Sequence, residues 1–260
     1  MISRNSKYLA LLLLLCICSS CKTFSRLTNK GGTVYTVEIE TAEANKDEII
    51  ERAVRITQNK IDAIGLDGEV SRIPDKPNQI SVKVYASEDP ERIKKFLFTT
   101  YQLELKKAVA SSVPQIFPNT EAAERAVVGE QEVLPYAESR DPERPEFIIV
   151  EKKAVITGED IRDASAYSRT GGAGDYQITF TLKPEGAARF GDWTGKNIGS
   201  YLAIVLDKKV LSAPVIKGQI SDQGMIEGRF TKASAEDIAL SLKSGYLPAT
   251  MKILEEKPFN

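Results

Sequence analysis

Two hydrophobic patterns organise the first part of the chain. Apolar residues at every second position predict strands, and a segment from Asn45 to Ile64 with one broad apolar face predicts a helix that stops at Gly65. A second helix is predicted from Asp89-Pro90 to about Thr99, because proline is favoured at the first helical position. The predicted strands are Thr33 to Glu40, Glu69 to Ile73, Gln79 to Tyr85 and Tyr101 to Val109.

The order of these elements is β-α-β-β-α-β, the split arrangement of ferredoxin-like domains, in which an antiparallel sheet carries both helices on one face. We therefore assign residues 31–110 to a ferredoxin-like base domain. Residues 111–146 contain five prolines among charged residues, which indicates a linker with one short helix around Thr120 to Val127. A length of 260 residues agrees with two domains.

Residues 147–248 predict a second, mixed α+β domain that we call the head. Its helices begin at Pro184 and Thr231, and the threonine can act as a helix cap. The C-terminal segment 249–260 predicts one more strand, Thr250 to Glu255, that returns to the first sheet. The other predicted head elements are a hairpin of Phe147 to Val150 with Ala154 to Ile156, a helical turn near Glu159 to Ala164, and strands Tyr176 to Leu182 and Gly224 to Phe230.

The segment from Leu202 to Ile220 predicts a buried hairpin at the centre of the head. Five apolar residues from Leu202 precede Asp207 and Lys208, and a second apolar run starts at Val210. Pro214 has no amide hydrogen for a neighbouring strand, so it should lie at a bulge or an edge.

Composition excludes several classes of function. The chain has 35 basic and 36 acidic residues, a balance that gives no reason to expect nucleic-acid binding. It has no histidine, which removes imidazole zinc ligands and the Ser-His and Cys-His nucleophile pairs of many hydrolases. The three cysteines all lie by residue 21, so the folded part has neither disulfide nor thiolate cluster.

The N-terminal region has the pattern of a secretory signal. Arg4 and Lys7 precede an apolar run that ends at Cys18, and this run is about half the length needed to cross a bilayer. Two serines then precede Cys21, which resembles the bacterial lipoprotein signal, in which that cysteine becomes the lipid-modified first residue. We therefore expect residues 1–20 to be a lipoprotein signal peptide, Cys21 the lipidation site and residues 21–30 a tether; the alternative is an ordinary cleaved signal.

Candidate chemical sites have simpler interpretations. The loop Gly171 to Gly174 precedes a strand and lacks the lysine and glycine spacing of a phosphate-binding loop. Asp207 fits ordinary turn chemistry better than catalysis, and the Ser-x-x-Lys spacing of Ser19 and Lys22 spans the expected cleavage site. Phe190 and Trp193 lie on a helix stripe typical of core residues rather than of a ligand platform. We therefore predict no catalytic, cofactor-binding or metal-binding residue.

Several segments resemble the first periplasmic domain of SecD, a membrane subunit of bacterial protein export. Gly31-Gly32 with its strand, the helix to Ile64-Gly65 and the helix at Asp89-Pro90 resemble the base of that domain. The resemblance in the head rests on Gly186-Ala187-Ala188-Arg189-Phe190, Asn197-Ile198-Gly199, Leu202 to Asp207, Ser212-Ala213-Pro214-Val215-Ile216 and Ser244-Gly245-Tyr246-Leu247-Pro248.

The resemblance implies a domain that contacts exported polypeptide and a head that moves relative to the base. SecD also has transmembrane helices before and after this domain. No apolar run after Cys18 approaches spanning length, so we expect a stand-alone lipoprotein without those helices and without a proton-driven motor.

The leading hypothesis is a lipid-anchored, non-enzymatic accessory of Sec-dependent protein export. It would bind unfolded or emerging polypeptide at an exposed sheet edge or in an apolar groove between head and base. Its partners would be exported polypeptides, Sec translocon components and the membrane that holds its lipid, on the cytoplasmic membrane's outer face or on the outer membrane, facing the periplasm. The alternatives are an envelope scaffolding lipoprotein with another partner and, least favoured, an enzyme.

Overall fold

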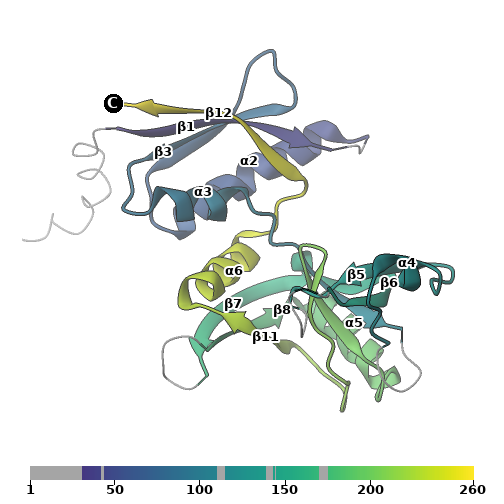
Figure 1. Cartoon of the computed structure of the whole chain (residues 1–260). Coiled ribbons are helices and arrows are strands. Elements are labelled where there is room, and N and C mark those ends of the chain that lie inside the picture. The colour runs from purple at the N-terminus through teal and green to yellow at the C-terminus, as the bar shows by residue number, and fades with distance from the viewer. Residues whose placement is uncertain (1–30, 42–43, 110–114, 139–142, 144, 170–174) are drawn as a thin grey trace, which may run out of the picture.

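The computed structural model of the protein describes residues 31–41, 44–109, 115–138, 143, 145–169 and 175–260. These residues form two units, the base and the head, which lie one above the other in Figure 1. The base contains the first elements of the chain and its last strand, and the head contains everything between them. The predicted α+β class, with a ferredoxin-like base and a mixed α+β head, is confirmed.

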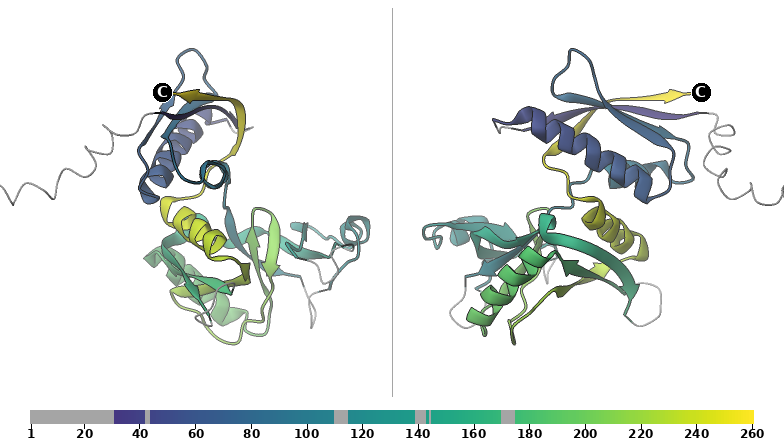
Figure 2. Two further views of the ribbon diagram at one scale, coloured as in Figure 1. Left: turned by 60° about the vertical axis from the view of Figure 1, so that its left-hand side comes forward. Right: turned by 180° about the vertical axis from the view of Figure 1, so that it is seen from behind.

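The base is a four-stranded antiparallel sheet with strand order β12-β1-β3-β2. Two helices cover the face of the sheet that is directed toward the head, as the two further views in Figure 2 also show. Inward-facing residues alternate with outward-facing ones along the strands, as a sheet with one covered face requires. The elements are β1 Gly32–Glu40, α2 Lys46–Ala63, β2 Gly68–Arg72, β3 Gln79–Tyr85, α3 Pro90–Phe98 and β12 Thr250–Phe259.

The sixth element of the base differs from the prediction. The strand predicted from Tyr101 to Val109 forms as β4, Leu103–Ala108, but it pairs with strands of the head. The edge position next to β1 is taken by β12, which runs antiparallel from Glu40↔Thr250 to Gly32↔Phe259. The reason is burial: almost every residue of β4 is enclosed, which suits a central strand between two partners, whereas β12 is exposed along most of its length. The base is therefore closed by the end of the chain.

The head contains a five-stranded sheet of order β10-β9-β4-β6-β5 and a three-stranded sheet of order β11-β8-β7. Helix α6 packs on β7 and β8 of the smaller sheet. Tyr136, just after β5, makes a parallel bridge to Val210 of β10, which brings the two edges of the larger sheet together. The remaining elements are α4 Thr120–Glu124, β5 Gln131–Pro135, β6 Phe147–Thr157, η1 Gly158–Asp160, β7 Ile161–Ser168, β8 Tyr176–Leu182, α5 Pro184–Lys196, β9 Leu202–Leu206, β10 Lys209–Ser212, β11 Gln223–Phe230 and α6 Lys232–Ser244.

Three predictions for the head were wrong. Residues 131–135, assigned to the linker, form β5 of the larger sheet. The predicted hairpin around residues 147–156 is the single strand β6, whose first half pairs with β5 and whose second half pairs with β4. The three charged residues 151–153 resemble the sequence of a turn. In the structure they stay within the extended strand, where the pairing with β4 shifts register. The predicted helical turn is limited to η1, and β7 follows it directly.

The hairpin predicted from Leu202 is confirmed. Strands β9 and β10 are antiparallel, and Asp207 and Lys208 between them have φ angles of 48° and 62°. Two consecutive residues with positive φ are typical of a type I′ turn, whose twist matches that of the flanking strands. The pairing shifts register between Val210 and Ser212, and Pro214 lies beyond the end of β10 on this edge of the sheet.

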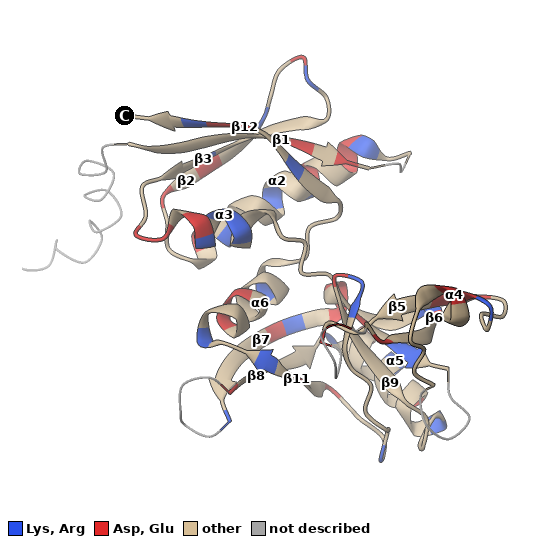
Figure 3. Cartoon of the chain, viewed as in Figure 1, with Lys and Arg blue, Asp and Glu red and all other residues tan. Residues whose placement is uncertain are grey.

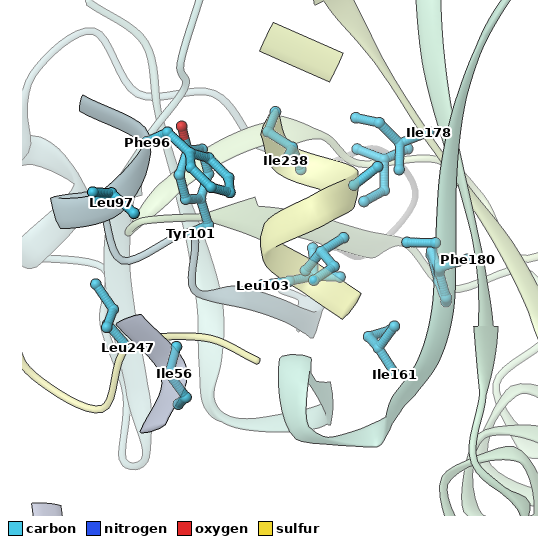
Figure 4. Close-up of a cluster of buried hydrophobic side chains, with 14 of the residues drawn as sticks. Ile56, Phe96, Leu97, Tyr101, Leu103, Ile161, Ile178, Phe180, Ile238 and Leu247 are labelled. Atoms are coloured by element: carbon cyan, nitrogen blue, oxygen red, sulfur yellow. The ribbon is translucent and has the colours of Figure 1, made fainter. Parts of the chain in front are cut away.

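One hydrophobic core runs through both units. Ile56 and Leu97 of the base and Ile178 and Phe180 of the head belong to the same cluster of buried residues, and Figure 4 shows this cluster in close-up. Leu247, in the segment that leads back to the base, is part of it. Among the described residues no helix has the length and apolar character that a membrane crossing needs.

Candidate functional site

An apolar groove opens in the head between its two sheets. It has a volume of about 640 Å³, and none of the residues that line it is charged. The lining comes from four strands, one helix and the loops that follow, so the site exists only in the folded head. The residues are Leu105, Thr179, Phe180, Thr181, Phe190, Leu202, Ile204, Pro214, Ile220, Gln223, Gly224 and Met225.

Strand periodicity places the aliphatic part of the lining. Leu202 and Ile204 are two residues apart on β9, so their side chains leave the same face of the strand. Leu105 of β4 is the register partner of Ile204, which extends this face to the neighbouring strand. Phe190 reaches the groove from α5, where it is buried. The larger sheet and α5 therefore form a continuous apolar wall.

The opposite wall depends on a glycine. Gly224 of β11 is the register partner of Phe180 on β8, and a β-carbon at Gly224 would lie 2.2 Å from Cζ of the Phe180 ring. Such a contact is impossible without moving the ring, so the ring occupies space that only glycine leaves free. The ring of Phe180 and the backbone of β11 can therefore lie close together at the groove.

Gly224→Ala is expected to lower the free energy of unfolding by about 1–3 kcal/mol, because the added methyl group forces the Phe180 ring out of its packing. Urea denaturation of the purified protein measures this change. Gly218→Ala is the matched control, since a β-carbon there has no neighbour within 4 Å. Equal effects of the two substitutions would contradict the close packing of Gly224 against Phe180.

The rim of the groove remains apolar at the surface. Met225 lines the groove and is 42% exposed, and Val215, next to the lining residue Pro214, is 39% exposed. Exposed apolar side chains beside an apolar depression mark surfaces that bind other molecules. An uncharged groove of this size can accept a few apolar side chains of a bound chain.

A second cleft lies between α3 of the base and α6 of the head, and its lining combines charged residues with apolar ones. Arg92 of α3 donates to both carboxylate oxygens of Asp237 on α6, at 3.3 and 2.8 Å. These hydrogen bonds raise the pKa of Arg92 above the usual value for arginine. Figure 3 shows Lys and Arg beside Asp and Glu on both helices. The groove without charged lining residues thus lies inside the head, whereas the cleft between head and base, where an apolar groove was expected, carries charges.

The structure places the remaining sequence candidates as follows. Asp207 lies in the β9–β10 turn, where its carboxylate accepts a hydrogen bond from the backbone N–H of Gln102 at 2.9 Å. Phe190 is buried and also lines the groove, whereas Trp193 is partly buried against the core. Cys21, Ser19, Lys22 and the loop Gly171 to Gly174 lie outside the described residues. Within the described part of the chain, no group of His, Cys, Asp and Glu is arranged to hold a metal ion.

The burial of two lysines was not predicted from the sequence. Lys60 of α2 and Lys106 of β4 are enclosed almost completely, at 0% and 1% exposure. Lysine in an amphipathic pattern normally indicates a solvated face, so the pattern carried no signal of their burial. Lys106 falls on a polar position of its alternating strand, two residues after Glu104, so nothing local marks it as buried.

Comparison with known proteins gives one consistent result. Residues 131–249 match the family described as SecDF, P1 head subdomain. The chain is 39% identical over 215 residues to the protein translocase subunit SecD of Aquifex aeolicus, covering 83% of this chain and 40% of that protein. It is 32% identical over 231 residues to the same subunit of Koribacter versatilis, covering 86% of this chain and 42% of that one.

Solved structures agree with the sequences. The crystal structure of SecDF in its super-membrane-facing form has a TM-score of 0.68 at 29% identity, and the match covers 89% of this chain and 31% of that one. A second structure, from a study of SecDF as a membrane component that enhances protein export, has a TM-score of 0.66 at 28% identity, with 85% of this chain and 98% of that chain covered. The described residues are therefore similar, in sequence and in fold, to the SecD and SecDF proteins named above.

The segment matched by the head-subdomain family is longer at its start than the predicted head. The match begins at residue 131, at the start of β5, whereas the predicted head begins at residue 147. The groove lies largely within the matched segment, since only Leu105 precedes residue 131. The chain spans about two fifths of the length of the SecD proteins named above.

Proposed function

We propose that the protein is a non-enzymatic accessory of Sec-dependent protein export that binds unfolded or emerging polypeptide in the head groove. The observation that carries the proposal is the uncharged, apolar groove within a head of the SecDF type. Unfolded chains expose apolar side chains that folded proteins bury, and such a groove can accept these without reading a particular sequence. The binding partners are then exported polypeptides, and Sec translocon components deliver them.

The proposal includes the cell envelope as the location, with the domain facing the periplasm. A lipid on Cys21 anchors the protein to the outer face of the cytoplasmic membrane or to the outer membrane. The support for this anchor is the sequence alone, in which two serines precede Cys21 after an apolar run. Several acyl chains make a stable anchor where one chain does not.

Met225→Glu is expected to weaken binding of an unfolded polypeptide at least about tenfold, because a carboxylate at the groove must lose water when an apolar segment binds. The probe is a reduced, carboxymethylated protein that cannot refold, and fluorescence anisotropy measures its affinity. Val128→Glu is the matched control: Val128 is also an exposed apolar residue, at 73%, but it lies outside the groove. Equal affinities of the two variants would contradict binding in the groove.

Photocrosslinking tests the role in export. A photoreactive amino acid at position 225 is expected to capture exported polypeptide during secretion, and the same amino acid at position 128 is not. Capture of envelope assembly proteins in place of exported chains would favour the alternative, an envelope scaffolding protein with the same fold.

Cys21→Ser is expected to abolish incorporation of labelled palmitate and to release the protein from the membrane fraction. Mass spectrometry of the mature wild-type N-terminus provides the independent measurement. An unmodified first residue would replace the lipid anchor with an ordinary cleaved signal, and it would leave the groove proposal unaffected.

A further inference from the structure

Two short segments connect the head to the base. Residues 99–102 lead from α3 to β4, and residues 245–249 lead from α6 back to β12. The two segments meet where the backbone N–H of Leu247 donates to the carbonyl of Thr100, at 3.3 Å. Figure 2 shows both of them passing through the narrow region between the units. The conformation of residues 99–102 therefore influences the direction in which the head points.

The base holds this segment through Lys60 of α2. Its ammonium group donates to the carbonyl oxygens of Phe96 at 3.2 Å and Thr99 at 2.7 Å. Nζ also lies 5.4 and 5.1 Å from the ring centroids of Phe96 and Tyr101. Carbonyls at the C-terminal end of a helix attract a cation, and aromatic faces do the same. Lys60 therefore joins α2 to the end of α3 and to the first residue of the connecting segment.

The head holds the same segment through Asp207. The carboxylate Oδ1 accepts hydrogen bonds from the hydroxyl of Thr100 and from the backbone N–H of Gln102, the latter at 2.9 Å. The backbone N–H of Asp207 donates to the carbonyl of Gln102 at 3.0 Å. The tip of the β9–β10 hairpin is thus bonded to the connection that precedes β4.

The residue between these two attachments is strained. Tyr101 is buried and has a φ of 50°, in the left-handed region that bulky residues avoid. Strain of this kind costs about 1–3 kcal/mol and persists only where the surroundings enforce it. Here Lys60 bonds to Thr99 on one side of Tyr101, and Asp207 bonds to Thr100 and Gln102 around it.

The other charged contacts between base and head are weaker candidates for this role. Arg52 pairs with Glu159 at 2.5 Å and Arg92 with Asp237 at 2.8 Å, but each pair has a partner more than a quarter exposed. Pairs in contact with water contribute about 0–1 kcal/mol. Lys60, in contrast, is fully enclosed.

We propose that Lys60 and Asp207 form a two-sided clamp on residues 99–102, which fixes the orientation of the head relative to the base. The clamp joins one residue from the base and one from the head around the same strained connection. When the hydrogen bonds of either Lys60 or Asp207 are removed, Tyr101 relaxes to an ordinary backbone conformation and the head samples more than one orientation. The groove then no longer faces a single direction relative to the base.

Pulsed electron paramagnetic resonance on the full chain tests the clamp. Spin labels attached through bio-orthogonal amino acids at Glu69 in the base and Lys217 in the head leave the native cysteines untouched, and both sites are exposed. The wild type is expected to give one narrow distance distribution. Asp207→Gly is expected to lose that single peak, because glycine accepts the positive φ at this turn but removes the carboxylate.

Matched variants separate the clamp from general damage. Asp207→Asn keeps an acceptor oxygen and tolerates positive φ, so it is expected to retain the narrow distribution. Lys60→Met removes the hydrogen bonds from α2 to the carbonyls of Phe96 and Thr99, and it is expected to broaden the distance distribution as Asp207→Gly does. Thr100→Val removes only the hydroxyl that donates to Asp207, and it is also expected to broaden the distribution. Circular dichroism verifies that each variant is folded, and wild-type distributions in folded Lys60→Met and Thr100→Val proteins would overturn the proposal.

Discussion

Lys106→Met is expected to lower the free energy of unfolding by about 1.5–3 kcal/mol, because it removes the charged hydrogen bonds of the buried ammonium group and leaves Glu132, whose side chain is 26% exposed, without its cation. The ammonium group of Lys106 pairs with Glu132, lies 3.2 Å from Glu104 and donates to the carbonyl of Lys152 at 2.7 Å. The side chain of Glu104 is only 10% exposed. Lys208 still contacts Glu104 at 3.0 Å in the variant, so Glu132 loses the most.

The neighbouring residue supplies the control. Lys107 points to the other face of β4, is partly exposed and lies 3.7 Å from Glu151. Lys107→Met is therefore expected to change stability by only about 0–1 kcal/mol. Urea denaturation at neutral pH compares the two variants, and adding Glu132→Gln to Lys106→Met is expected to recover part of the loss. Similar small effects of both methionine substitutions would refute a buried ion-pair network at Lys106.

The second large effect concerns pH and Lys60. Burial lowers the pKa of Lys60 from 10.5 to about 7, and the nearby carboxylates of Asp207 and Asp237 oppose this shift. Tyr101 also faces the ammonium group, while Arg92 pairs with Asp237. Between pH 7 and 10.5 the unfolded chain binds more protons than the folded chain. The free energy of unfolding should therefore rise with pH through this window, and Lys60 should add no pH dependence below it.

The expected slope is up to about 1.4 kcal/mol per pH unit, the value for one proton. Urea denaturation between pH 7 and 9.5 measures it, and the absence of histidine removes the usual competing titration at the lower end. Lys60→Met is expected to abolish the slope, whereas Lys217→Met, at an exposed position, is expected to keep it. A wild-type slope in the Lys60 variant would mean that another group controls the pH dependence.

Much of the secondary structure could be predicted from local patterns. The helix α2, the strand β3 and the cap of α6 follow from periodicity and capping residues, and Thr231 does accept the N–H of Ser234 at 3.1 Å. The two-residue turn at Asp207 and Lys208 is also a local property. Errors occurred where charged residues interrupt an extended strand, as at residues 151–153 of β6, because local chemistry there resembles a turn.

The candidate site could not be predicted in the same way. Its lining residues extend from Leu105 to Met225, and no short segment contains enough of them to indicate a groove. The close fit of Gly224 under Phe180 depends on strand register, which the sequence leaves open. The resemblance to SecD agrees with the comparisons, but it did not distinguish the groove inside the head from one between head and base.

By itself the sequence determined the α+β class, most of the helices and strands, and the resemblance of the chain to SecD. These properties depend on the side chains of neighbouring residues, so local periodicity reports them. Only the tertiary structure decided that β4 pairs with strands of the head and not of the base, that the groove forms between two sheets, and that Lys60 and Lys106 are buried. Strand pairing and burial are set by residues far apart in the chain, because free energy is gained only when those distant residues exclude water together.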